Sequence, residues 1–255
     1  MLLAVDVGNT QTHVGVFRDQ DLLEHWRFHT ARAATADELA FVLSALLRLR
    51  DLRLADLDAA MVSCVVPTLA EEYDRARQRY LGGKGALVGP SMRTGMPIRI
   101  DNPRELGADR LVNAVAAYDR VGGPCIAVDF GTALNYDVVS AEGEYLGGVI
   151  SPGIEISLEA LSQRAAALPK VRLAPPRTAI GKGTLEAMQS GLVFGYAGQV
   201  DGMVARLREE LGCEAPAIAT GGFAAAIVPH CDQVDEVDDL LTLQGLRIIW
   251  ERNRS

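Results

Sequence analysis

The start of the chain combines apolar runs with polar alternation in a way that predicts a three-stranded antiparallel meander. Leu2–Asp6 is a short apolar run typical of a buried strand, and His13–Arg18 alternates between polar and apolar residues. After the turn sequence RDQD, the strand pattern returns over Leu22–Phe28. Asp6 therefore ends the first strand at a Gly-Asn-Thr turn, which places a carboxylate at the mouth of a hairpin.

Beyond residue 30 the pattern changes to helices separated by short apolar strands. Helices are predicted over Ala36–Arg50, Pro67–Tyr80 and Leu106–Tyr118, the second of them opening on its proline. Strands are predicted within DAAMVSCVV (58–66) and GALVGP (85–90). The prolines in the segment from 92 to 101 favour an extended conformation there.

The same order of patterns begins again after the sequence VGGP at 121–124. The predicted elements are strands over Cys125–Asp129, Ala133–Val139 and Tyr145–Ile150, a helix after the Pro-Gly step at 152–153, a long helix over about Thr184–Leu211, a strand within APAIATGG, and a last helix over Leu240–Arg252. Such a repeated order indicates an internal duplication in an α/β protein. We expect two halves, 1–121 and 122–255, that pack face to face across a cleft.

Both halves carry an aspartate followed by a glycine turn, in DVGNT (6–10) and DFGT (129–132). A glycine turn presents backbone N–H groups and lets a phosphate approach closely. A bare carboxylate would repel that phosphate, so each aspartate needs a cation between itself and a nucleotide. Either turn alone is more often an ordinary hairpin, but the matched pair favours a polyphosphate site.

A third motif, NPRELGADR (102–110), places Asp109 and Arg110 beside Gly107 near the start of a helix. The aspartate could accept a proton from a hydroxyl group, and the arginine could hold a carboxylate through two hydrogen bonds. The alternative is a helix-start carboxylate favoured by the dipole, with the arginine facing solvent. The chemistry of the residues favours neither interpretation over the other.

Two further glycine segments lie at predicted helix starts. TGGFA (220–224) follows a strand and suits an adenosine or its phosphate, and IGKGT (180–184) could present Lys182 or Thr184 to a ligand. Each segment alone is more often a plain helix entry, so both gain weight only from the other motifs.

Composition limits the classes of function. The net charge of −8 argues against a general nucleic-acid binder, which needs a surplus of cations. The four cysteines and four histidines lack metal-ligand spacing, so a zinc enzyme is not expected. No apolar run reaches the roughly 18 residues of a membrane span and no leader pattern precedes the first strand, so a cytoplasmic location is expected.

Taken as a set, the motifs resemble the type III pantothenate kinase family. In order, they are DVGNT, NPRELGADR, DFGTALNYDVV, YLGGVISPGI, ALP (167–169), IGKGT, MQSGLVFGYAGQVDGM, ATGG and LTLQGL, and they extend from Asp6 to Leu246. The resemblance implies the acetate and sugar kinase, Hsp70 and actin fold, which consists of two ribonuclease-H-like halves around a nucleotide cleft. It also implies ATP-dependent phosphorylation of pantothenate, the first step of coenzyme A synthesis, by a homodimer with its substrate pocket near the subunit interface.

The resemblance also implies roles for individual residues. The ATP phosphate loop would consist of Asp6, Val7, Gly8, Asn9, Thr10, Gln11, Thr12 and His13, with Asp6 near a divalent cation such as Mg²⁺. Pantothenate would contact Gly107, Ala108, Asp109, Arg110 and Thr184, with Asp109 as the base. Asp129 would bind the K⁺ or NH₄⁺ ion that the family requires, and Thr132 would contact ATP.

The chain departs from the family pattern at three places, and none of them removes a charged residue of the implied mechanism. Leu134, Asn135 and Tyr136 replace a threonine- and phenylalanine-rich strand, Gly183 replaces a frequent asparagine, and Ile100 replaces a frequent tyrosine. The alternatives are a related small-molecule kinase with another acceptor and a non-catalytic regulatory accessory protein. The retained Asp6, Asp109, Arg110, Asp129 and Thr132 favour the enzyme.

Overall fold

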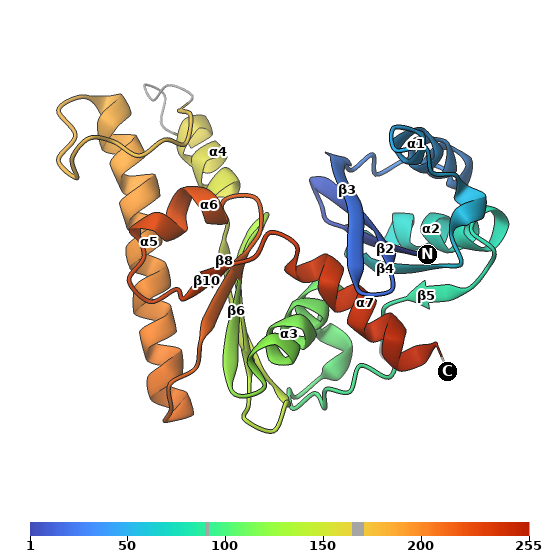
Figure 1. Ribbon diagram of the computed structural model, residues 1–255. Helices are drawn as coiled ribbons and strands as arrows, with labels where there is room; N and C mark the ends of the chain where they lie inside the picture. The colour runs from blue at the N-terminus through green and yellow to red at the C-terminus, as the bar shows by residue number, and fades with distance from the viewer. Residues whose placement is uncertain (90–91, 165–170, 255) are drawn as a thin grey trace. The chain divides into compact units, whose positions relative to one another are not determined.

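The computed structural model describes residues 1–89, 92–164 and 171–254, which form two compact units (Figure 1). Unit 1 comprises Met1–Met96, Asp101–Ala116 and Leu241–Ser255, and unit 2 comprises Pro97–Ile100 and Ala117–Leu240. Each unit is built around one five-stranded sheet. The motif ALP at 167–169 and the last residue of GALVGP lie outside the described residues.

The sheet of unit 1 has the strand order β3-β2-β1-β4-β5. The first three strands, β1 (Leu2–Val7), β2 (Gln11–Arg18) and β3 (Asp21–His29), form the predicted antiparallel meander. Strands β4 (Ala59–Cys64) and β5 (Gly85–Leu87) add to β1 in parallel. The helices of this unit are α1 (Ala36–Arg48), α2 (Pro67–Tyr80), residues 108–116 of α3 (Ala108–Val121) and α7 (Leu241–Asn253), with short 3₁₀ turns at Leu54–Asp56 and Pro103–Glu105.

Side chains alternate along β1, so the apolar core residues and Asp6 lie on opposite faces of the sheet of unit 1. Leu3, Val5 and Val7 point into an apolar core shared with α1 and α2. Since side chains alternate along a strand, Ala4 and Asp6 point to the opposite face. Helix α7 packs on that face, because Leu243 lies against Gly15, the β2 residue directly opposite Ala4.

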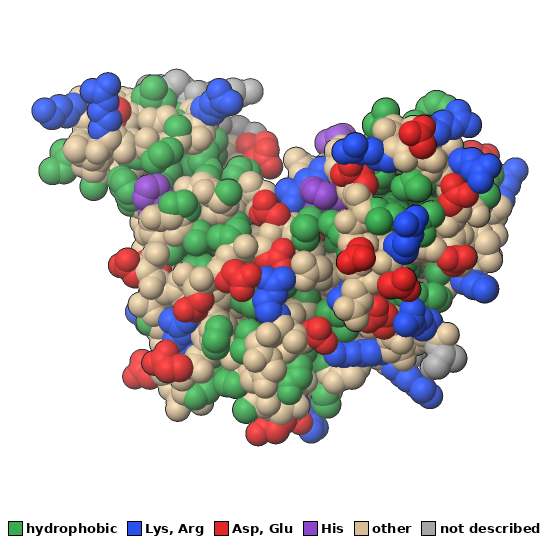
Figure 2. Space-filling model, viewed as in Figure 1, with side chains coloured by type: hydrophobic (Ala, Val, Ile, Leu, Met, Phe, Trp, Pro, Cys, Tyr) green, Lys and Arg blue, Asp and Glu red, His purple; other side chains and the backbone are tan. Residues whose placement is uncertain are grey.

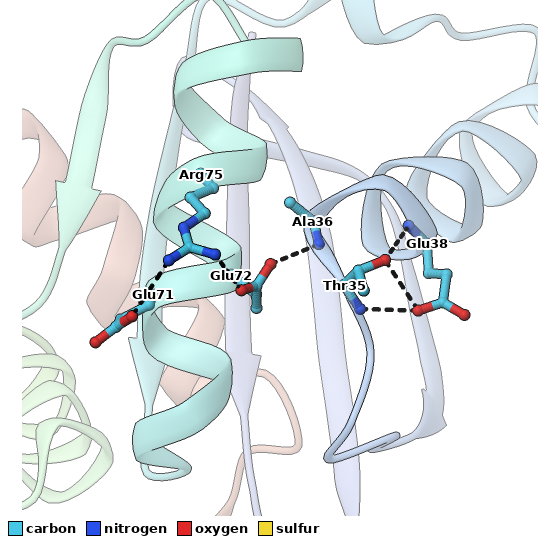
Figure 3. Close-up of polar contacts among 6 residues, drawn as sticks. All are labelled: Thr35, Ala36, Glu38, Glu71, Glu72 and Arg75. Atoms are coloured by element: carbon cyan, nitrogen blue, oxygen red, sulfur yellow. Dashed lines mark hydrogen bonds and ion pairs between the residues drawn. The ribbon is translucent and has the colours of Figure 1, made fainter.

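Helix α1 begins with a capping box that the sequence pattern did not single out (Figure 3). The Thr35 hydroxyl donates to Glu38 Oε2 (3.0 Å), and the Glu38 carboxylate also accepts from the Thr35 backbone N–H (2.8 Å). Glu72 on α2 accepts from the backbone N–H of Ala36 (2.8 Å) and is itself paired with Arg75 (2.7 Å). Side chains therefore satisfy free N–H groups at this helix start, which also joins α1 to α2.

Unit 2 repeats the topology of unit 1. Its sheet has the order β10-β9-β6-β7-β8, with an antiparallel meander of β6 (Cys125–Phe130), β7 (Ala133–Val139) and β8 (Tyr145–Pro152), and with β9 (Ala217–Thr220) and β10 (Glu236–Val237) added in parallel. The helices are α4 (Ile154–Arg164), α5 (Thr184–Leu211) and α6 (Ala224–Ile227), followed by a 3₁₀ turn at Val228–His230. The repeated strand order confirms the predicted duplication.

The compact units differ from the predicted halves 1–121 and 122–255 at three places, one of which is the boundary itself, since residues 117–121 belong to unit 2. The last helix, α7, belongs to unit 1, because its buried leucines pack on β1, β2 and β4. Residues 97–100 belong to unit 2, where Ile98 forms an isolated bridge with Tyr145. The placement of α7 and that of residues 97–100 come from contacts between residues distant in the sequence, which periodicity does not report.

The surface carries charges of both signs. On the face shown in Figure 2, acidic and basic side chains are interspersed over the surface. Among the described residues, no helix is long and apolar enough to cross a membrane.

Candidate active site

Asp6 lies near the end of β1, opposite Ser63 on β4 and His13 on β2. Among the described residues its Oδ1 atom is buried and has no hydrogen-bond partner. Burial raises the pKa of Asp6 from 3.8 to about 7, and the negative charge of Asp109 adds to the rise; Ser63 and Arg27 oppose it. An unsatisfied carboxylate oxygen beside a second carboxylate is a place where a cation would be stabilising.

The turn after Asp6 is tight, and its exposed part is short. The backbone N–H of Gly8 donates to the Gln11 carbonyl (3.0 Å), and a Cβ on Gly8 would lie 2.9 Å from that oxygen. Arg32 donates to both the carbonyl (3.3 Å) and the Oδ1 atom (3.2 Å) of the exposed Asn9. The hydrogen bond of Gly8 and those of Arg32 together hold the turn in this shape.

Three side chains of the proposed phosphate loop are buried inside unit 1. Val7 belongs to the apolar core, and Thr12 Oγ1 lies 3.0 Å from Thr30 Oγ1. His13 Nε2 lies 3.1 Å from His25 Nδ1, and burial, with smaller effects of Arg27 and His25, lowers the pKa of His13 to about 3. If these three residues contact a nucleotide, we therefore expect them to do so through their backbone.

Asp109 and Arg110 occupy the first turn of α3, as the sequence predicted. The backbone N–H of Arg110 donates to Asp109 Oδ1 (2.8 Å). Burial raises the pKa of Asp109, and this hydrogen bond and the Arg110 charge oppose the rise. A Cβ on Gly107 would lie 2.6 Å from Asp109 Oδ1, so the glycine leaves the space that the carboxylate occupies.

Asp6 and Asp109 are thus brought together in unit 1, although 103 positions separate them in the sequence. The described residues contain no group of three or more His, Cys, Asp or Glu side chains suited to a metal. Two carboxylates with an unsatisfied oxygen fit a Mg²⁺-like ion, which usually takes one or two carboxylates together with substrate phosphates and water. Ser63 was missed in the sequence, where its only signal was a polar residue within an apolar strand.

Unit 2 has its own Asp-Gly turn, enclosed by two glycines. Asp129 is in β6, and the Gly131 N–H donates to the Ala133 carbonyl (3.1 Å). A Cβ on Gly153 would lie 2.3 Å from the Thr132 carbonyl, and one on Gly221 would lie 2.5 Å from Asp129 Oδ1. Gly221 also has a φ of +95°, which disfavours other residues. The TGG motif therefore lies against Asp129, because β9 pairs with β6.

Thr184 begins α5 in unit 2, whereas residues 107–110 belong to unit 1. Thr184 is exposed, and Gly183 is an N-cap without a side-chain hydrogen bond. Among the other departures from the family pattern, Leu134 is a core residue and Asn135 is buried opposite Asp129. The substitutions at 134 and 135 are thus accommodated inside the sheet of unit 2.

Two units of identical strand order, each with an Asp-Gly turn after its first strand, define the fold of the acetate and sugar kinases, Hsp70 and actin. Solved structures with this fold include a glucokinase of the ROK family from Streptomyces griseus (TM-score 0.53, 14% identity, 99% of each chain covered). Another is a Campylobacter jejuni protein described as a Baf-family transcriptional activator (TM-score 0.61, 18% identity, covering 99% of this chain and 98% of that one).

The sequence comparisons identify the family. The model of the type III pantothenate kinase family matches residues 2–206. Type III pantothenate kinases of Moorella thermoacetica and Streptomyces avermitilis are 48% and 51% identical to this chain, over 99% and 100% of its length and 100% and 99% of theirs. The chain belongs to the type III pantothenate kinase family.

Proposed function

We propose that this chain transfers the γ-phosphoryl group of ATP to the primary hydroxyl of pantothenate, with Asp109 as the proton acceptor. The product is 4′-phosphopantothenate, and the reaction is the first step of coenzyme A biosynthesis. The observation that carries the assignment of the site is the half-buried pair of carboxylates, Asp6 and Asp109, in a chain that matches the family over nearly its whole length.

Phosphoryl transfer requires positioning and charge neutralisation more than covalent help from the protein. Asp109 takes the proton of the attacking hydroxyl as its oxygen bonds to the γ-phosphorus, and ADP leaves with the electrons of the broken P–O bond. A base works best with a pKa near the working pH, and the burial that raises the pKa of Asp109 moves it in that direction.

The remaining residues bind the substrates. Arg110 would hold the pantothenate carboxylate, and Gly107, Ala108 and Thr184 would contact the rest of that molecule. The turn from Asp6 to His13 and Thr132 would bind the phosphates of ATP. Asp6, with its unsatisfied oxygen, would hold a Mg²⁺-like cation, which neutralises charge on the phosphates when it is bound.

A coupled assay of ADP formation tests the function directly. We expect ADP formation to depend on pantothenate and to stop when it is omitted. ADP formation at the same rate without pantothenate, or none with it, would contradict the assignment. Replacing pantothenate by other small alcohols in the same assay identifies a kinase with a different acceptor.

We also propose that Asp129 binds a monovalent cation. Its carboxylate lies near the end of β6, next to the Asp-Gly turn of unit 2, where a cation would offset the repulsion between the carboxylate and a bound polyphosphate. Activity should therefore be high in potassium or ammonium chloride and low in sodium chloride at equal ionic strength. Equal rates in all three salts would remove this role. An Asp129→Asn variant should lose the difference between the salts.

Finally, we propose that the enzyme is a cytoplasmic homodimer. Ile150 on the edge strand β8 and Ile156 and Leu161 on the following helix α4 are exposed, the first by 63%. Exposed apolar groups of this kind are typical of contact surfaces between proteins. Light scattering should give the mass of two chains, and a mass of one chain at micromolar concentration would contradict the proposal. Cell fractionation tests the location.

A further inference from the structure

The motif LTLQGL (241–246) belongs to the family pattern but has no part in the chemistry described above. It forms the first turns of α7, and Leu241, Leu243 and Leu246 are fully buried in the structure. Two of its other residues, Thr242 and Gly245, do not serve this apolar packing. Their contacts instead lead to α3, the helix that carries Asp109.

Helix α7 meets α3 at a point that only glycine allows. A Cβ on Gly245 would lie 2.3 Å from the Val112 carbonyl oxygen, a distance at which the backbone of one helix would have to move. Next to this crossing, the Thr242 hydroxyl donates to Asn113 Oδ1 (2.7 Å). Asn113 is 1% exposed, so the bond is made in a nearly water-free place where its loss is costly.

These contacts lie on the same stripe of α3 as Asp109. Val112 and Asn113 follow Asp109 by three and four residues, and residues at these spacings share one face of a helix. Along the axis of α3, about one helical turn, a rise of about 5.4 Å, separates these two residues from Asp109. A shift or rotation of α3 at Val112 would therefore be passed directly to Asp109.

The other side of α7 rests on the strands that carry Asp6. Leu243 lies against Gly15 on β2, where a Cβ would be 2.8 Å from the leucine Cδ1 atom. Gly15 is opposite Ala4 on β1, and Ala4 and Asp6 share one face of the sheet. Helix α7 thus contacts, through one short segment, both the sheet face of Asp6 and the helix of Asp109 (Figure 1).

We propose that the LTLQGL segment sets the position of Asp109 relative to Asp6, with Thr242 and Gly245 as positioning residues. The glycine fixes how closely α3 approaches, and the threonine fixes its rotation. This inference rests on the proposed role of Asp109 as the base. Small displacements of a reacting group are expensive in catalysis, since a 1 Å misplacement can cost about a hundredfold in rate.

The test is Thr242→Val, which keeps the shape of the side chain and removes the hydrogen bond. We expect kcat to fall by about tenfold to a hundredfold, with KM for ATP changed less than about twofold. Thr242→Ser should restore kcat. Gly245→Ala should lower kcat further, again with little change in KM for ATP. If the alanine variant does not fold, the kcat of Thr242→Val alone tests the proposal.

Thr35→Val is the matched control. It also removes a threonine hydroxyl bonded to a side chain, at the capping box of α1, and touches neither α3 nor α7. Its thermal stability should fall by a similar amount, while its kcat should stay at the wild-type value. A Thr242→Val enzyme with the same kcat as Thr35→Val would overturn the proposal.

A double variant separates this inference from the proposed function. In an Asp109→Asn background, Thr242→Val should lower kcat no further, because it acts through the missing carboxylate. An additional loss by the same factor would show that the segment acts elsewhere and would overturn the inference alone. A normal kcat in Asp109→Asn itself would overturn the role of the base, and the inference with it.

Discussion

Replacing Asp109 by asparagine should lower kcat by about two to four decades, the loss expected when general-base catalysis is removed. Asparagine keeps the size of the side chain and an oxygen that can accept the hydrogen bond now made by the Arg110 backbone N–H. The KM values should change little, because the carboxylate is needed mainly as the proton moves. Steady-state kinetics with circular dichroism as a check on folding measures both.

The pH profile gives a second signature of the same variant. Burial raises the pKa of Asp109, so wild-type kcat should fall on the acid side at a pH above the usual range for aspartate. The direction follows because the base must be deprotonated to work. The residual activity of Asp109→Asn should lack this acid limb.

Arg110→Ala is the matched control for the neighbouring residue. It should mainly raise KM for pantothenate, because the lost contact exists before and during the transfer. KM for ATP should barely move in either variant. A near-normal kcat in Asp109→Asn, or weakened ATP binding in Arg110→Ala, would favour the simpler account of a helix-start carboxylate and a solvent-facing arginine.

Asp6→Asn should lower turnover by about a hundredfold or more while raising the stability of the free protein. The loss is expected because even residues that only support a metal ligand cost 10- to 100-fold when they are changed. The Asn side chain keeps the shape of the site but not the charge that faces the cation. If the variant is fully active, or if it does not fold, the result would indicate that Asp6 has a purely structural role in the hairpin.

The gain in stability depends on pH in a defined direction. The pKa of Asp6 is about 7 in the folded protein against 3.8 for an ordinary aspartate, so its contribution to stability is complete below about pH 4. It is lost as the pH rises through about 7. Without nucleotide or divalent cation, Asp6→Asn should therefore exceed the wild type in unfolding free energy at pH 8, by up to about 4 kcal/mol, and much less at pH 4.

Asp58→Asn provides a control of opposite sign for this measurement. The positive N-terminal amine lowers the pKa of the Asp58 carboxyl, through a hydrogen bond and its charge. Such a group stabilises the folded state above its unfolded pKa and loses that effect as the pH falls. Asp58→Asn should thus be less stable than the wild type at neutral pH. If the unfolding free energies of both variants changed with pH in the same direction, the raised pKa of Asp6 would not be the cause of the gain in stability.

Local pattern was enough to predict most of the secondary structure. The helix Pro67–Tyr80, the strand Ala133–Val139 and the helix Thr184–Leu211 have the predicted bounds, because proline, alternation and helical periodicity act within a few residues. The two-residue strand β10 was missed, since a strand so short has no period to detect. Its pairing with β9 is the only reason that it is a strand.

The sequence by itself also identified the family and predicted which residues carry the chemistry, because Asp6, Asp109 and Asp129 stand in motifs whose order is specific to that family. Only the tertiary structure decided the pKa values of these groups and the contacts that surround them. The pKa of Asp6 depends on burial and on the charge of Asp109, and Thr242 and Gly245 contact the helix that carries Asp109. The physical reason is that desolvation, Coulomb interaction and close packing act between atoms that meet in space, and no spacing along the chain reports that meeting.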